Sequence, residues 1–121
     1  MGLFGPKLSK DEKDKAKAIA TRGVAARAQI AAMTETGQTR GEVAREIEFR
    51  LVFTPTGGSE IEVVTQQFMN DLTLTGLTPG EPASISYDGT NPTTVLVHGS
   101  PKYRIIQAQG ALVAVPVVDQ G

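Results

Sequence analysis

The chain contains no cysteine and no tryptophan, and it has a single histidine, His98. The absence of cysteine excludes disulfides, thiolate nucleophiles and cysteine-ligated metals. A metal site needs two or three further ligands beside a histidine, and a general base needs an acid or a nucleophile next to it. His98 follows an apolar run and precedes Gly99, so we interpret it as a turn residue. We therefore expect a non-catalytic protein with no cofactor and no bound metal.

Long apolar runs and a strong net charge are also missing. The longest wholly apolar run, residues 111–118, is far shorter than the roughly 20 residues that cross a bilayer. No secretory signal is recognisable, so we expect a cytoplasmic protein. Residues 1–27 hold seven Lys or Arg and three acidic residues, whereas the rest of the chain holds five and ten. An acidic body repels phosphate backbones, so we expect no nucleic acid partner.

Glycine and proline, by contrast, are abundant, with 13 and 7 in 121 residues. This density of turn-forming residues favours a single all-β domain. The turn pairs Pro79-Gly80 and Asp88-Gly89 enclose a segment in which Ala83, Ile85 and Tyr87 alternate with polar residues. Such period-2 alternation predicts a strand with one solvated face over residues 83–88, followed by another strand through residues 95–97.

Three further strands are predicted by the same pattern, over residues 24–34, 45–54 and 60–69. For residues 24–34 a helix is the competing prediction, because alanine favours helices. The clearest is residues 45–54, whose apolar face consists of Ile47, Phe49, Leu51 and Phe53. We expect it to form an antiparallel hairpin with residues 60–69, and we expect a loop at residues 36–41. The predicted fold class is therefore mainly all-β, as a small curled sheet or barrel of five to six strands with one N-terminal α-helix.

That helix is predicted by the capping-box pattern of Ser9 and Glu12 and by the alanine- and lysine-rich segment that follows. Its apolar stripe is thin (Ala16, Ile19 and Ala20, extended by Val24), and Gly23 is suited to the left-handed residue that ends a helix. We divide the chain into an N-terminal tail and helix (residues 1–22), a β-domain (23–99) and a C-terminal arm or edge strand (100–121).

The C-terminal arm is the strongest candidate for an interaction site. It contains an apolar run that ends near Pro116, which cannot donate a hydrogen bond to a neighbouring strand. An exposed apolar edge promotes association unless something covers it. Two outcomes are open: the arm pairs with its own barrel, or it pairs with a neighbouring chain. The candidate interaction residues are Leu112, Val113, Val115, Val117 and Val118, together with Leu3 and Phe4, which could give a weak peripheral membrane contact.

Residues 23–97 resemble a group of small bacterial β-domains of unknown function, of the type common in actinobacteria. The resemblance rests on Leu77-Thr-Pro-Gly80 and on Tyr87-Asp88 followed by Asn91-Pro92. This sequence differs from the typical members of that group at Gly89, where proline is common. The resemblance implies a β-fold and carries almost no information about chemistry.

We therefore predict a structural or protein-interaction module, such as an accessory subunit of a larger assembly, with a protein partner or a homo-oligomeric state. The alternative is a small-molecule-binding β-barrel, because apolar pockets leave no sequence motif. Asp88 and Asn91, with nearby threonine hydroxyls, raise the question of a calcium loop. Their spacing is not that of an EF-hand, and turn chemistry accounts for the same residues.

Overall fold

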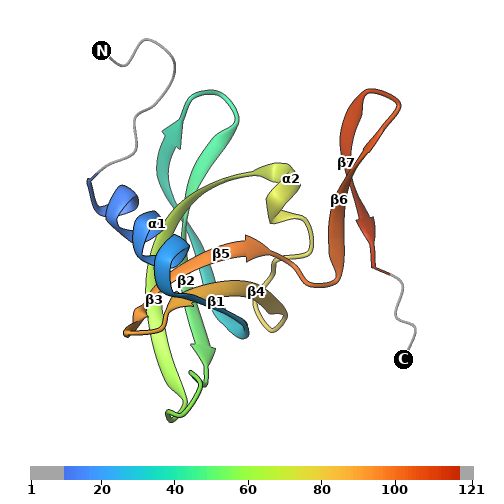
Figure 1. Ribbon diagram of the computed structural model, residues 1–121. Coiled ribbons are helices and arrows are strands. Elements are labelled where there is room, and N and C mark those ends of the chain that lie inside the picture. The colour runs from blue at the N-terminus through green and yellow to red at the C-terminus, as the bar shows by residue number, and fades with distance from the viewer. Residues whose placement is uncertain (1–9, 118–121) are drawn as a thin grey trace.

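The computed structural model describes residues 10–117, in which a helix and a curled five-stranded sheet precede a separate two-stranded hairpin (Figure 1). The mainly all-β fold with an N-terminal helix is thereby confirmed. In chain order, the elements are α1 (Lys10–Arg22), β1 (Gly23–Arg40), β2 (Ala44–Phe53), β3 (Ile61–Asn70), α2 (Asp71–Leu74), β4 (Pro82–Asp88), β5 (Asn91–Gly99), β6 (Tyr103–Ala108) and β7 (Ala111–Pro116).

The five-stranded sheet has the order β3-β2-β1-β4-β5, and all its neighbouring strands are antiparallel. The long strand β1 joins its two halves, because residues 23–29 pair with β4 and residues 29–40 pair with β2. The sheet curls until its two end strands, β3 and β5, come into contact. This strand order, with α2 between β3 and β4, is that of the OB-fold, a partly open five-stranded Greek-key barrel.

An irregularity in β1 allows this strand to serve both halves of the barrel. The pairing register with β2 shifts between Ile30 and Ala32, so one residue is bypassed. A bulge of this kind bends a strand and reverses which side chains face inward. Accordingly, Ala28 and Ile30 are buried before the shift, and Met33 packs against the core after it.

The barrel interior is filled by side chains from all five strands. The predicted apolar face of β2 is confirmed, since Ile47, Phe49, Leu51 and Phe53 are all buried, and β2 pairs antiparallel with β3 as expected. The alternating face of β4 is confirmed in the same way. The buried core consists of Ala28, Ile30, Ile47, Phe49, Leu51, Phe53, Val63, Met69, Leu77, Ala83, Ile85, Tyr87, Val95 and Val97.

Side chains close the seam between β3 and β5. The amide of Gln67 on β3 donates from Nε2 to the carbonyl oxygen of Val97 (2.7 Å), and its Oε1 accepts from the Val97 N–H (2.9 Å). The Gln67 side chain thus replaces the strand neighbour that Val97 lacks on this side. Nearby, Lys15 Nζ of α1 donates to the inward-facing hydroxyl of Thr65 at 2.8 Å. The helix therefore lies over the barrel and reaches into its seam.

The helix differs in two respects from the sequence expectation. Among residues 13–22, the half-buried ones are Lys15, Ala18 and Ile19, whereas Ala16 and Ala20 are exposed, so the predicted stripe is wrong at these two positions. Gly23 is the first residue of β1 and does not adopt a left-handed conformation. A Cβ atom at Gly23 would lie 2.3 Å from the carbonyl oxygen of Ile19, so glycine is required here for close approach of the backbone.

Three other local expectations are corrected. The predicted loop at residues 36–41 is mostly strand, because β1 continues to Arg40 and only residues 41–43 turn. His98 lies within β5 and is not a turn residue. The C-terminal arm forms a two-stranded sheet of its own, in which β6 pairs with β7. Neither open outcome for the arm included this self-pairing.

Candidate interaction surface

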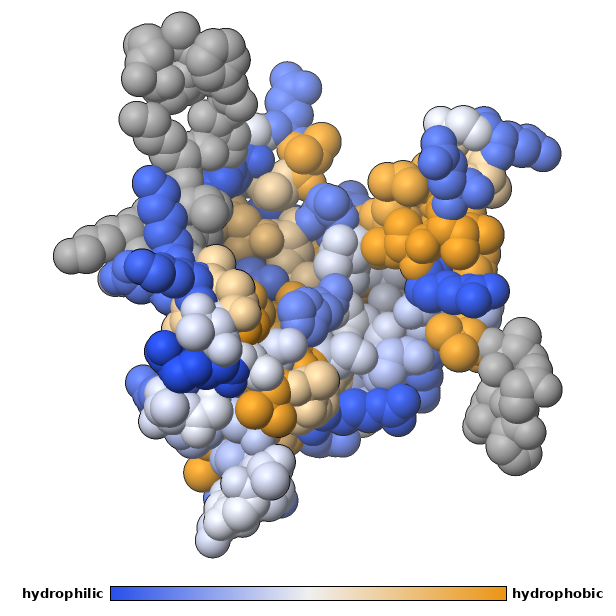
Figure 2. Space-filling model, viewed as in Figure 1, coloured by the Kyte–Doolittle hydropathy of each residue, from blue (hydrophilic) through white to orange (hydrophobic). Residues whose placement is uncertain are grey.

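Exposed apolar side chains gather on the β6–β7 hairpin, which projects from the barrel (Figure 1). In Figure 2 the corresponding atoms form the large orange area on the right of the molecule. Leu112 is 61% exposed and Ile105 is 45% exposed, although both are large aliphatic residues. The exposed members of this surface, which we call the hairpin surface, are Ile105, Ile106, Leu112, Val113 and the adjoining Val117.

A tight turn with two left-handed residues creates the hairpin. Gln109 has φ 52° and Gly110 has φ 79°, which are the signs required by a type I′ turn. This turn matches the twist of two antiparallel strands, so it sets the register of the whole hairpin. The register runs from Ala108 opposite Ala111 at the turn to Tyr103 opposite Pro116 at the base.

Both faces of the hairpin are apolar. Residues that pair across two strands share a face, and successive residues alternate between faces. One face therefore carries Tyr103, Ile105, Gln107, Leu112, Ala114 and Pro116, and the other carries Arg104, Ile106, Ala108, Ala111, Val113 and Val115. Within the hairpin, Arg104 is the only residue that carries a charge at neutral pH. A two-stranded sheet is marginally stable in water by itself, so a hairpin of this composition is suited to being covered.

The hairpin is anchored to the barrel at its base. Tyr103 packs over Gly76, where a Cβ atom would lie 2.6 Å from two atoms of the tyrosine ring. Lys102 pairs with Glu81, and its backbone N–H donates to Ser100 Oγ at 3.1 Å. A cavity of about 250 Å³ separates the first face of the hairpin from the barrel, lined by residues that include Leu72, Thr73, Ser84, His98, Ile105 and Ala114.

The predicted interaction residues differ in their exposure in the structure. Leu112, Val113 and Val117 are exposed on the hairpin surface, and Val115 is half-buried. Val118, Leu3 and Phe4 lie outside the described residues. The prediction omitted Ile105 and Ile106, which are exposed as well. Two consecutive isoleucines in a strand place one on each face, and that signal could have identified them.

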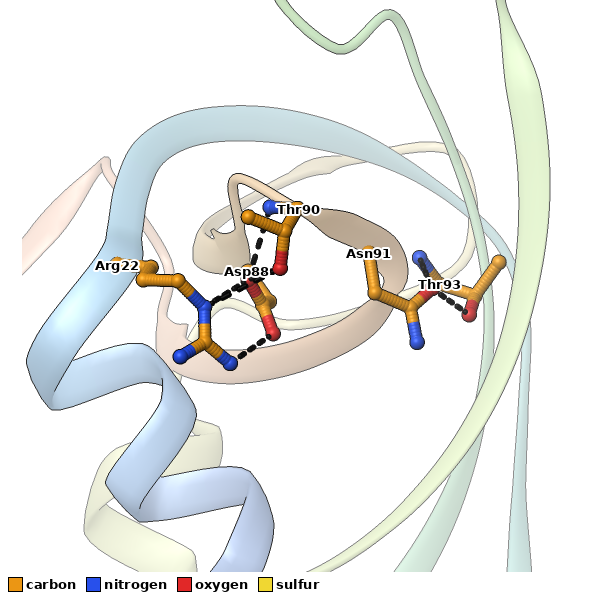
Figure 3. Close-up of polar contacts among 5 residues, drawn as sticks. All are labelled: Arg22, Asp88, Thr90, Asn91 and Thr93. Carbon is orange, nitrogen blue, oxygen red and sulfur yellow. Dashed lines mark hydrogen bonds and ion pairs between the residues drawn. The ribbon is translucent and has the colours of Figure 1, made fainter.

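Apart from the hairpin surface, a cluster of polar side chains joins α1 to the end of β4 (Figure 3). Arg22 donates from Nε to Asp88 Oδ1 at 3.0 Å and from Nη2 to Asp88 Oδ2 at 2.9 Å. The backbone N–H of Thr90 also donates to Asp88 Oδ1, at 2.9 Å. The Arg22 hydrogen bonds, followed by those from Thr90, hold the pKa of Asp88 well below its ordinary value, although burial of the carboxylate opposes this.

These contacts account for the residues that suggested a calcium loop. Both carboxylate oxygens of Asp88 accept from Arg22, and the side-chain oxygen of Asn91 accepts from the Thr93 hydroxyl at 2.7 Å. Between residues 10 and 117, no group of three His, Cys, Asp or Glu side chains is positioned to hold a metal ion. The arrangement is that of an ion pair and a turn that fasten α1 to the barrel.

His98 has one close polar neighbour. Its Nε2 lies 2.7 Å from the hydroxyl of Ser86 on the adjacent strand β4. A serine nucleophile with a histidine base also requires a third group that orients the base, together with a site for the substrate. His98 is exposed on the outer face of the barrel, so we interpret the contact as a link between β4 and β5.

Comparison with known proteins adds no relative. No protein-family model matches the chain, and no curated protein or solved structure shows significant similarity to it. The resemblance of residues 23–97 to small bacterial β-domains therefore stays a prediction. In the part of the chain that the structure describes, no helix is long and apolar enough to cross a membrane.

Proposed function

We propose that this chain is a non-catalytic protein-interaction module in which the barrel is a scaffold and the β6–β7 hairpin is the docking element. An accessory subunit of a larger assembly, or a homo-oligomer, would have this form. One observation carries the proposal: the hairpin exposes apolar side chains on both faces, although it is anchored at its base and β7 lies against α2.

The free energy gained by burying the hairpin surface supports a docking role and also limits the affinity that side chains alone can give. Burying a Val, Leu or Ile side chain completely contributes about 1.5–3 kcal/mol. Scaled by their exposed fractions, the five residues of the hairpin surface would contribute about 3–7 kcal/mol on docking. Association costs about 4–15 kcal/mol in lost freedom. Side-chain burial alone therefore supports weak binding, and stable binding would require backbone hydrogen bonds in addition.

The alternative function, a small-molecule-binding barrel, is less well supported. The barrel interior is occupied by fully buried side chains, namely Ile30, Phe49, Leu51, Ile85 and Val95. A ligand there would have to displace several of them. The cavity between barrel and hairpin measures about 250 Å³, and larger hollows of about 640 and 660 Å³ lie outside the barrel interior, at the β1–β2 turn and at the base of the hairpin. We propose a protein partner over a nucleic acid because Arg104 gives the hairpin a single charge for contacting phosphates.

The proposal is tested by making the hairpin surface polar. Ile106 and Val113 pair directly across the hairpin, and replacing both with threonine keeps β-branched side chains that favour strands. Val64→Thr is the matched control, because Val64 is 53% exposed but lies on β3. Wild type and control, each tagged, are compared with the double variant for capture of protein from the native host and for mass by light scattering.

We expect the wild type and Val64→Thr to form the same associated species, and the Ile106→Thr/Val113→Thr variant to lose it. All three proteins should unfold at similar temperatures, since neither change touches the barrel core. An associated species that survives in the double variant would contradict the proposal, as would a wild-type chain that associates with nothing.

A further inference from the structure

The hydrogen-bonding phase of the hairpin, which is the set of cross-strand pairs that exchange hydrogen bonds, shows which backbone groups point outward. In antiparallel strands, pairs that exchange hydrogen bonds alternate with pairs whose N–H and C=O groups face away from each other. The Val117 N–H donates to the Lys102 carbonyl oxygen at 2.8 Å, which sets the phase at the base. The type I′ turn gives the same phase, because the residues flanking a two-residue turn form a hydrogen-bonded pair.

The outward-facing residues follow from this phase and the register. On β6, the outer edge presents the N–H and C=O groups of Tyr103, Ile105 and Gln107. On β7, the outer edge presents the N–H and C=O groups of Leu112 and Ala114 and the C=O group of Pro116. Each edge is a template on which a further strand could form hydrogen bonds.

The two edges are not equivalent. Pro116 has no N–H, so the outer edge of β7 lacks one of its donors. Ala114 is also half-buried, and β7 lies against α2. On β6, Ile105 and Gln107 are both exposed, and only the Tyr103 N–H is engaged, with the Ser100 carbonyl oxygen at 3.3 Å. The β6 edge is therefore the better template for strand addition.

We propose that β6 pairs with β6 of a second copy of this chain, antiparallel and centred on Ile105, to form a continuous four-stranded sheet. This inference rests on the proposed docking role of the hairpin and names its partner. Ile105 exchanges both backbone hydrogen bonds with Ile105 of the second copy. Tyr103 lies opposite Gln107, whose N–H donates to the Tyr103 carbonyl oxygen while the Tyr103 N–H keeps its bond to Ser100. The same operation on β7 would be centred on Ala114, which is half-buried on the strand that lies against α2.

The chemistry of β6 suits a partner identical to itself. In this register, Arg104 lies opposite Ile106 of the second copy, so like charges are not placed directly opposite each other. Pairing about a two-fold axis is self-complementary and closes at two copies. Pro116 on each outer β7 strand then limits the growth of the sheet. The dimer converts a marginal two-stranded hairpin into a four-stranded sheet.

Two proline variants of the full chain test this pairing. Ile105→Pro removes an outward N–H from β6, and Leu112→Pro removes an outward N–H from β7. Both leave the hydrogen bonds within the hairpin intact. Light scattering over a concentration series should give twice the 12.8 kDa chain mass for the wild type and for Leu112→Pro. Ile105→Pro should be monomeric, with a dissociation constant at least about tenfold higher, the effect of about 1.4 kcal/mol.

Amide hydrogen exchange gives a second readout that needs no substitution. The N–H groups of Ile105 and Gln107 should exchange more slowly as the concentration of the wild-type chain rises, and the N–H of Leu112 should not change. A monomeric wild type, equal dimerisation of both proline variants, or concentration-dependent protection at Leu112 would overturn the inference. A monomer that still captures another protein through Ile106 and Val113 would refute the self-pairing alone and leave the docking role in place.

Discussion

Gln67 offers a direct test of how the barrel closes. Its side-chain amide makes two hydrogen bonds to the backbone of Val97, across the seam where β3 and β5 do not form a ladder. Gln67→Leu keeps a side chain of similar size but removes both the donor and the acceptor. Gln66→Leu is the matched control, because the neighbouring Gln66 is exposed and its side chain donates to the half-buried Glu48 at 3.0 Å.

The expected loss in the free energy of unfolding follows from the backbone groups that Gln67→Leu leaves without partners. Leaving a buried donor or acceptor unsatisfied costs about 1–3 kcal/mol. Gln67→Leu leaves both the N–H and the C=O of Val97 without partners, and Val97 is only 3% exposed. Water can reach part of the seam because Gln67 itself is half-buried. We therefore expect Gln67→Leu to lower the free energy of unfolding by about 2–4 kcal/mol and the control by less than about 0.5 kcal/mol.

Chemical denaturation with a linear extrapolation measures both values. The Val97 amide should also exchange faster in Gln67→Leu than in the control, because its acceptor is lost. A Gln67→Leu protein as stable as Gln66→Leu would refute the view that this side chain closes the barrel.

The remaining predictions concern the core, the helix junction and the histidine. Phe49→Ala should cost about 3–5 kcal/mol in denaturant unfolding, since the ring is fully buried; wild-type stability would refute this. The Asp88 pKa is lowered by Arg22, so its stabilisation is complete above about pH 4 and is lost as the pH falls. Asp88→Asn should therefore be less stable at pH 7 and lose less stability on acidification; a parallel acid profile would contradict this. His98→Ala should change stability little, because its bond to Ser86 is exposed, and a transition metal lost with His98 would contradict a purely structural role.

The barrel was predictable because its strands have one apolar and one polar face. The alternation in residues 45–54 identified the buried side of β2 and its antiparallel pairing with β3. The length of β1 was not predictable, since Thr36 and Gly37 favour a turn locally. Pairing with β2 carries the strand through these residues, with a register irregularity between Glu35 and Thr39. Tertiary pairing thus outweighed local preference.

The sequence predicted that the candidate site is an apolar segment, but it did not predict that this segment forms a hairpin. An apolar run of eight residues ending near a proline indicated an adhesive segment. That this run pairs with residues 103–108 depends on Gln109, which adopts a positive φ that is uncommon for a residue with a side chain. The contacts Gln67–Val97, Lys15–Thr65 and Arg22–Asp88 join residues at least 30 positions apart, and no local pattern marks such pairs.

The central claim is that the barrel folds without the hairpin and that the hairpin carries association. A chain that ends at Arg104 keeps Tyr103 on Gly76 and removes most of both hairpin strands. Its mass by light scattering and its thermal midpoint should be measured beside those of the full chain. We predict a monomer whose midpoint lies within about 5 °C of the full chain, a change of about 1 kcal/mol. A truncated chain that unfolds, or one that still associates as the full chain does, would contradict the claim.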